Sequence, residues 1–317
     1  MPSLFARTFS LFLLALACIQ PAHAEVDWDP KNTWVFIVGL LTFENSDEYG
    51  SFPQKNRRDV QLLDYFKSIG VPADQIVYLQ DEKARLATIE SAFSKFLDRT
   101  DENSLLVVYY CGHGFPDDDN EAKVYFASYD ASVGDVTGWS VDRMVAQIES
   151  SFQGSDALLL ADCCHSGALS NVAKRKGSEV NYVCLSSSTL RKSSTGTWTF
   201  TESLLAALRG DPETDLDQDG SVTLKEAHDF AKAEMEFGED QKTSWFVSEE
   251  WSGPETLADA RERTDPRIGA HVEVNYGKKS YKGRVTDRKD DQYKVFFYGF
   301  EDTEAEWVNE KEIQWQE

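Results

Sequence analysis

The sequence has few cysteines and few cations, and each shortage excludes a class of protein. Five cysteines among 317 residues are too few for a scaffold held together by disulfides. The 32 Lys and Arg residues are outnumbered by 55 Asp and Glu residues, which gives a net charge of −23. So acidic a protein repels nucleic acids and anionic membranes. Most of this charge is expected on a solvated surface, and the rest favours cationic peptides or metal ions as partners.

Long apolar runs are also scarce, and the most conspicuous one is N-terminal. Arg7 precedes an apolar stretch over 9–19, a proline and the small-residue ending Ala22-His23-Ala24. The stretch is too short to span a bilayer, and the pattern is typical of a secretory signal peptide over residues 1–24. We therefore predict an exported protein, secreted or periplasmic, with no membrane span after signal cleavage. A buried N-terminal helix or a retained anchor is the alternative.

Apolar strand patterns and amphipathic helix patterns alternate along residues 30–250. Continuous runs rich in β-branched residues predict strands buried on both faces, and apolar residues at helical spacing predict helices. The strands are expected at 33–41, 75–79, 104–110, 157–161 and 181–187, with helices within 54–70, 84–98 and 140–152. This alternation implies right-handed crossovers and a mainly parallel sheet. The predicted fold class is a three-layer α/β sandwich.

Reactive side chains directly follow two of the predicted strands. The strand at 104–110 leads into Cys111-Gly112-His113-Gly114, and the strand at 157–161 leads into Asp162-Cys163-Cys164-His165. In such sheets, ligands and catalytic groups collect beyond the carboxyl ends of the strands, so the two motifs should meet at one edge. Because side chains alternate between the faces of a strand, only one of Cys163 and Cys164 should face His113.

Together the two motifs resemble those of the caspase-like cysteine peptidases, and in particular the metacaspases. The matching stretches are YYCGHG at 109–114, DCCHSG at 162–167, NRRDVQLL at 56–63 and TFTESLLAAL at 199–208, so the resemblance covers about residues 33–210. It implies that Cys164 is the nucleophile and that His113 is the base which a thiol needs at neutral pH. It also implies an oxyanion hole formed by the backbone amides of Gly114 and Cys164.

The same resemblance implies an acidic pocket for the substrate residue that precedes the cleaved bond. Asp59 and Asp162 stand at the positions of the family's pocket acids, and Cys111 stands where the family usually has serine. Two carboxylates in one pocket repel each other unless a cation joins them. The implied specificity is therefore for Arg or Lys, which would form charge-assisted hydrogen bonds. The basic loop at 171–180 is either a site of self-cleavage, as is frequent in this family, or simply a solvated loop.

Other interpretations of the motifs remain open. A zinc site built from their Cys and His residues is disfavoured, because neither motif has the C-x₂₋₄-C spacing that brings two thiolates onto one ion. A catalytically silent interaction protein of the same fold is a second alternative, although the intact Cys164 and His113 argue against it. A peptidase of the legumain or clostripain type, with a different specificity, is a third.

Residues 215–226 match the calcium-loop pattern D-x-[DN]-x-[DN]-G-x₅-E in full. Helical patterns flank the loop, and Gly220 permits its sharp turn. The expected ligands are the carboxylates of Asp215, Asp217 and Asp219, the carbonyl of Ser221, Thr223 at a position often filled through water, and a bidentate Glu226. The predicted cofactor is Ca²⁺, which would either switch the activity or only stabilise the loop.

The composition changes after a charged linker at 252–265, which separates a peptidase domain at 25–251 from residues 266–317. This last segment has short alternating strands separated by turns, and it resembles a small SH3-like barrel of the Tudor type. Its aromatic residues either fill the core or line a cage for a cation or peptide ligand: Tyr276, Tyr281, Phe297, Tyr298 and Trp307. The predicted protein is an exported, calcium-binding cysteine endopeptidase acting on peptides or proteins with basic residues, with no nucleic-acid partner.

Overall fold

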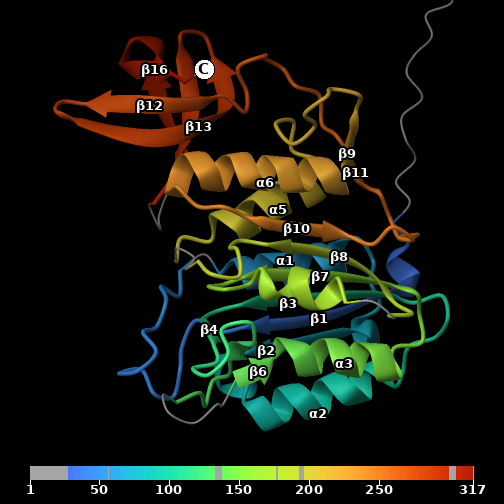
Figure 1. Ribbon diagram of the computed structural model, residues 1–317. Helices are drawn as coiled ribbons and strands as arrows, with labels where there is room; N and C mark the ends of the chain where they lie inside the picture. The colour runs from blue at the N-terminus through green and yellow to red at the C-terminus, as the bar shows by residue number, and fades with distance from the viewer. Residues whose placement is uncertain are drawn as a thin grey trace, which may run out of the picture.

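The computed structural model describes residues 28–55, 57–132, 138–175, 178–192, 196–299 and 305–316. The predicted signal peptide lies outside the described residues, and so do residues 176 and 177 of the basic loop. The main body is a sheet with helices on both faces, and a separate antiparallel sheet lies at the C-terminal end (Figure 1). No helix in the described ranges is long and apolar enough to cross a membrane.

The main sheet has six strands in the order β10-β8-β7-β3-β1-β2. All neighbours are parallel except the edge strand β10, which is antiparallel to β8. The strands are β1 (Thr33–Gly39), β2 (Ile76–Gln80), β3 (Leu105–Cys111), β7 (Asp156–Asp162), β8 (Asn181–Ser186) and β10 (Ser244–Val247). The central strands β1, β3 and β7 are buried along their whole length, as a sheet covered on both faces requires. The predicted α/β sandwich is confirmed.

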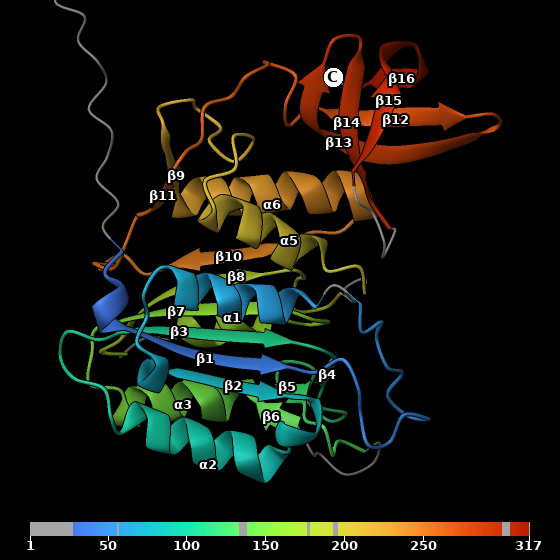
Figure 2. The ribbon, with the colours of Figure 1, turned by 180° about the vertical axis from the view of Figure 1, so that it is seen from behind.

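Helices form the two outer layers (Figure 2). One face carries α1 (Arg58–Ser68), α5 (Thr199–Leu208) and α6 (Leu224–Glu239), and the other carries α2 (Leu86–Leu97), α3 (Val141–Ser151) and α4 (Ala168–Ala173). Since strand residues alternate between faces, Phe36 of β1 packs toward α2 while Ile37 joins the core beneath α1 and α5. The helix expected within 54–70 begins only at Arg58, and its buried apolar residues are Leu62, Leu63 and Phe66.

Two small antiparallel sheets extend this body. The first, β4 (Gly114–Pro116), β5 (Val124–Ala127) and β6 (Gly138–Ser140), directly follows β3. The second pairs β9 (Ser221–Thr223) with β11 (Thr256–Asp259). The prediction of a linker at 252–265 missed β11, because a short strand that depends on a distant partner has no strong local pattern. The chain therefore returns to the acidic loop at 215–226 before it enters the C-terminal sheet.

The C-terminal module, defined here as residues 271–315, is a five-stranded antiparallel sheet in the order β15-β14-β13-β12-β16. Its strands are β12 (His271–Tyr276), β13 (Lys279–Lys289), β14 (Gln292–Phe297), β15 (Glu306–Asn309) and β16 (Ile313–Trp315). Two hairpins form, as the predicted strands and turns lead one to expect, with Tyr276 opposite Lys279 and Lys289 opposite Gln292. At the first turn Gly277 has φ of 66°, a left-handed conformation that glycine adopts without steric cost.

A buried ionic cluster joins the C-terminal module to α6. Arg284 of β13 pairs with Glu213 and, at 2.8 Å, with Glu234 of α6. The Glu234 carboxylate also accepts a 2.7 Å hydrogen bond from the Tyr298 hydroxyl and lies 2.7 Å from His271 Nε2. Buried charges are tolerated only when they are paired and hydrogen-bonded. The cluster therefore holds the module in one orientation on the helix.

Candidate active site

The two sequence motifs meet at the carboxyl edge of the main sheet. Strands β3 and β7 are parallel neighbours, with Cys111 opposite Asp162, and Gly39 at the end of β1 lies opposite Cys111. Three strand ends therefore lie side by side. His113 follows the end of β3, and Cys163 and Cys164 follow the end of β7. Because β3 and β7 are parallel neighbours, these residues lie at the same edge of the sheet.

The adjacent cysteines have different surroundings. Cys163 is 1% exposed and lies in the core, whereas Cys164 is partly exposed. Burial raises the pKa of Cys163 well above its ordinary value, which disfavours a thiolate there. Gly114 lies against the Cys164 backbone, since a Cβ atom on this glycine would come within 2.1 Å of the Cys164 carbonyl oxygen. The structure thus brings the segment that contains His113 and Gly114 against both cysteines, and Cys164 is the accessible one.

His113 is fixed by a backbone carbonyl and by aromatic rings. Its Nε2 atom lies 2.8 Å from the carbonyl oxygen of Gly50, and because a carbonyl oxygen can only accept, this nitrogen carries the proton. The rings of Phe43, Tyr49 and Phe52 surround it, at centroid distances of 5.0, 5.7 and 4.6 Å. Burial lowers the pKa of His113, and the Gly50 carbonyl opposes this shift. The result is a neutral imidazole with a free lone pair on Nδ1, the form that a general base requires.

The contact of Gly50 with His113 could not be predicted from the sequence. The group that contacts His113 is a backbone carbonyl, which every residue type has, so no residue pattern points to it. Position in the fold supplies the only signal, because the loop after β1 passes over the edge where His113 lies.

Asp162 is a buried carboxylate at the end of β7. It is 2% exposed, and its Oδ2 atom accepts hydrogen bonds from the Thr201 hydroxyl at 2.6 Å and the Thr201 amide at 3.2 Å. Burial raises the pKa of Asp162 to about 6, although the hydrogen bonds from Thr201 and Ser187 oppose this shift. Cys111, on the neighbouring strand, is also buried, and burial followed by the charge of Asp59 raises the pKa of its thiol.

Asp59 reaches the same edge from the first turn of α1. A Cβ atom on Gly39 would come within 1.9 Å of Asp59 Oδ2, so the carboxylate occupies space that any other residue at position 39 would fill. Asp59 accepts hydrogen bonds from Arg57 Nε at 3.1 Å, Arg57 Nη2 at 2.8 Å and the Tyr78 hydroxyl at 2.7 Å. Arg57 also pairs with Asp81. The two predicted pocket acids therefore lie on either side of Cys111, but Asp59 already has a cation from the protein itself.

The acidic loop has the turn that its sequence pattern predicts. Carboxylate oxygens of Asp215, Asp217 and Asp219 all lie within 4.8 Å of one another, and Gly220 has φ of 94°. Ser221 and Thr223 follow in β9. The three aspartate carboxylates could hold a metal ion, and carboxylate oxygens are hard donors of the kind that Ca²⁺ prefers. The Glu226 carboxylate accepts hydrogen bonds from the Leu216 amide at 2.8 Å and the Thr223 amide at 2.9 Å, so it closes the loop and caps α6 at once.

The aromatic residues proposed as a cage do not share one surface. Phe297 lies in the core of the C-terminal module, and Tyr298 is buried at the contact with α6, where it binds Glu234. Tyr276 is 43% exposed and packs beside Tyr281 and Phe297, at centroid distances of 5.9 and 6.2 Å. Trp307 is 42% exposed. Tyr298 is therefore an interface residue rather than part of a cage, because its hydroxyl needs a partner that α6 supplies.

A family model described as the caspase domain matches residues 46–253. A structure of protein GSU0716 from Geobacter sulfurreducens is 14% identical over 73% of this chain and 100% of that chain, with a TM-score of 0.50. A structure of caspase-1 from Spodoptera frugiperda is 11% identical over 77% of this chain and 98% of that chain, with a TM-score of 0.45. The search of curated proteins gave no match.

Proposed function

The chain belongs to the caspase family of cysteine peptidases, and on this premise we propose that it is a metacaspase-like endopeptidase that cleaves after Arg or Lys with a Cys164/His113 dyad. One observation carries the proposal: the accessible Cys164 lies against Gly114, the residue that follows His113. His113 is neutral, and its Nε2 proton points at the Gly50 carbonyl. A free Nδ1 lone pair and an accessible thiol are the two groups that acyl transfer by a cysteine peptidase needs.

In the proposed reaction, His113 Nδ1 takes the proton from the Cys164 thiol, and the thiolate attacks the scissile carbonyl carbon. Negative charge develops on the carbonyl oxygen, where the amides of Gly114 and Cys164 would donate hydrogen bonds. The imidazolium then gives its proton to the leaving amine, which leaves a thioester on Cys164. Water, deprotonated by His113, hydrolyses the thioester and regenerates the thiol. The Gly50 carbonyl keeps the ring oriented throughout and stabilises the imidazolium.

The preference for a basic residue rests on Asp162 and Asp59. Asp162 has a pKa of about 6, raised by burial, so it is ionised at neutral pH and a cationic side chain would relieve the cost of burying its charge. Arg57 already compensates Asp59. We therefore assign Asp162 the larger share of the electrostatic attraction for a substrate Arg or Lys.

Calcium binding and export belong to the same proposal. The aspartate cluster at 215–219, with Ser221, Thr223 and Glu226 after it, offers the oxygen donors that Ca²⁺ prefers. Binding would hold the start of α6, and α6 packs against α5 next to the catalytic sheet. Secretion or export to the periplasm rests on the signal-like segment at 1–24. The exposed Tyr276 and Trp307 favour a peptide ligand of the C-terminal module.

A peptide panel tests the proposal. The purified protein is assayed with fluorogenic peptides that end in Arg, Lys, Asn or Asp, with calcium and with chelator. We expect turnover after Arg and Lys, its loss in Cys164→Ala and His113→Ala, and most of it retained in Cys163→Ala. Cleavage after Asn would favour a legumain-type enzyme, and cleavage after Asp would contradict the basic pocket. Absence of turnover on every peptide would favour the catalytically silent alternative.

A further inference from the structure

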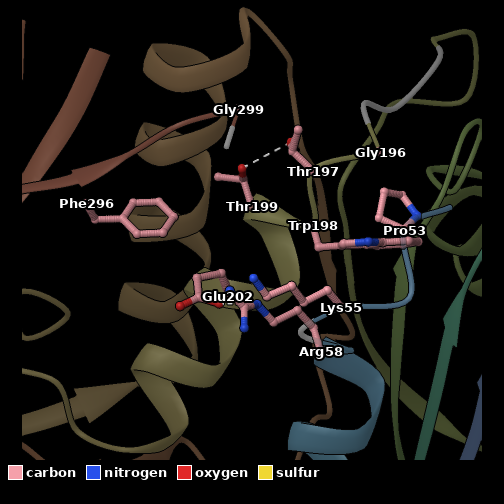
Figure 3. Close-up of a pocket in the computed structure, with 10 residues that line it drawn as sticks. All are labelled: Pro53, Lys55, Arg58, Gly196, Thr197, Trp198, Thr199, Glu202, Phe296 and Gly299. Carbon is pink, nitrogen blue, oxygen red and sulfur yellow. Dashed lines mark hydrogen bonds and ion pairs between the residues drawn. The ribbon is translucent and has the colours of Figure 1, made fainter. Parts of the chain in front are cut away.

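A pocket lies between the peptidase domain and the C-terminal module (Figure 3). Pro53, Arg58, Trp198 and Glu202 line it from the peptidase domain, and Phe296 lines it from the C-terminal module. In Figure 3 the Trp198 indole and the Pro53 ring lie next to each other, and Phe296 lies on the opposite side. Neither domain alone forms this pocket.

The pocket is close to the catalytic histidine. The ring of Phe52, the residue before Pro53, is 4.6 Å from the His113 ring and 4.9 Å from the Trp198 ring, measured between centroids. Two such ring contacts span about 10 Å, which is the length of about three residues of an extended peptide. A substrate bound at Cys164 therefore passes within reach of the pocket.

The chemistry of the walls favours an apolar occupant. Trp198 and Pro53 offer apolar rings on one side, and Phe296 offers a third on the other. Three charged residues also line the pocket, Lys55, Arg58 and Glu202. Arg58 and Glu202 form an ion pair with each other, so their two charges are mutually compensated. Trp198 has φ of 62° at the N-terminus of α5, a conformation that is costly for a bulky residue and concentrates at functional sites.

Phe296 is held firmly at this position. It lies opposite Arg284 in the pairing of β14 with β13, and the Arg284 guanidinium is 5.8 Å from the centre of its ring. Arg284 is in turn paired with Glu213 and Glu234 of the peptidase domain. The cluster that docks the module therefore also positions the ring that closes the pocket.

We propose that the C-terminal module completes a substrate subsite, in which Phe296, Trp198 and Pro53 bind an aromatic or large aliphatic side chain of the peptide. This side chain lies within about three residues of the cleaved bond, given the reach estimated above. The inference rests on the proposed peptidase function. It gives the module a role in specificity for the peptidase itself, whether or not the module also binds a separate ligand.

Peptide binding to the full-length Cys164→Ala protein tests this subsite without requiring turnover. Calorimetry compares fluorogenic hexapeptides, in which Arg is joined to an amide-linked fluorophore, that carry Phe at one of the three preceding positions with the version that has glycine at all three. Partial burial of one aromatic side chain against these rings should favour one Phe peptide by about fivefold in Kd. Adding Phe296→Ala should abolish that preference, Phe296→Leu should restore part of it, and Trp315→Ala, which removes an aromatic residue of the module outside the pocket, should preserve it.

The outcomes separate the inference from the function on which it rests. An equal preference in Phe296→Ala and its parent would overturn the subsite, and so would equal binding of all peptides by the parent. Wild-type cleavage of the glycine peptide after Arg would leave the proposed function intact in either case. If the wild-type protein cleaves none of the peptides, the proposed function fails, whereas a Phe296-dependent preference in binding would still support an apolar site at the domain junction.

Discussion

Replacing Asp162 by Asn should make the protein more stable at alkaline pH while it weakens cleavage after Arg. Asp162 is 2% exposed and accepts hydrogen bonds from neutral donors, the Thr201 amide and hydroxyl among them. An asparagine oxygen can accept the same bonds from Thr201. The substitution thus removes a buried charge and preserves these hydrogen bonds.

The size of the effect follows from the pKa of Asp162. Burial raises this pKa from 3.8 to about 6, so the folded state binds the proton more tightly than the unfolded state does. The carboxyl group therefore contributes stability that is greatest below 3.8 and is lost as the pH rises through 6. A shift of about two units corresponds to about 3 kcal/mol in full, and about half of that is gained between pH 8 and pH 5. The Asn variant lacks this dependence.

Urea unfolding at pH 5 and pH 8 measures the difference. We expect the stability of Asp162→Asn relative to wild type to be about 1 to 1.5 kcal/mol greater at pH 8 than at pH 5. Any effect of the asparagine amide on the free energy of unfolding that does not depend on pH cancels in this comparison between two pH values. Asp64→Asn is the matched control, because the Asp64 side chain is 66% exposed, and it should show little such dependence. If the free energy of unfolding of Asp162→Asn differs from that of wild type by the same amount at both pH values, Asp162 is not a desolvated carboxylate.

Three further predictions concern His113, Arg57 and the acidic loop. His113 has a pKa lowered by burial from its ordinary 6.5, so an NMR titration of its ring in the Cys164→Ala protein should give a midpoint below pH 6.5, and a higher midpoint would contradict the neutral base. Arg57→Gln leaves Asp59 and Asp81 without their shared cation and should lower the free energy of unfolding by about 3–5 kcal/mol. Arg99→Gln is the control, because its partner Asp74 is 75% exposed, and it should lower that free energy by no more than about 1 kcal/mol. Equal losses in urea unfolding would show that the Arg57 ion pairs stabilise the protein no more than an exposed pair does. Calcium at a hundredfold excess over its Kd should stabilise the wild-type protein by about 2.7 kcal/mol. In thermal melts, the rise in melting temperature from chelator to calcium should be smaller for Glu226→Gln than for wild type. Identical melting temperatures in all samples would exclude a working calcium site.

Much of the fold could be predicted from local patterns. The apolar runs at 33–41, 104–110 and 157–161 are long and continuous, as strands buried on both faces must be, and they form β1, β3 and β7. Parallel neighbours end at the same edge, so the meeting of the two motifs also followed from the strand pattern. The acidic loop was equally clear, because its turn and its carboxylates are specified by consecutive residues.

The features that the sequence did not reveal all depend on groups far apart in the chain. The Gly50 carbonyl contacts His113 across 63 positions, Arg284 pairs with Glu213 across 71, and Phe296 and Trp198 line one pocket at the junction of two domains. None of these has a periodicity or spacing to detect. By itself the sequence determined the strands, the order of the reactive motifs and, by alternation, that only one of Cys163 and Cys164 faces His113. The resemblance to the family motif pointed to Cys164 as that residue. Only the tertiary structure decided which backbone carbonyl orients the histidine, which cation neutralises Asp59 and where the C-terminal module lies, because burial and pairing between distant groups exist only once the chain has folded.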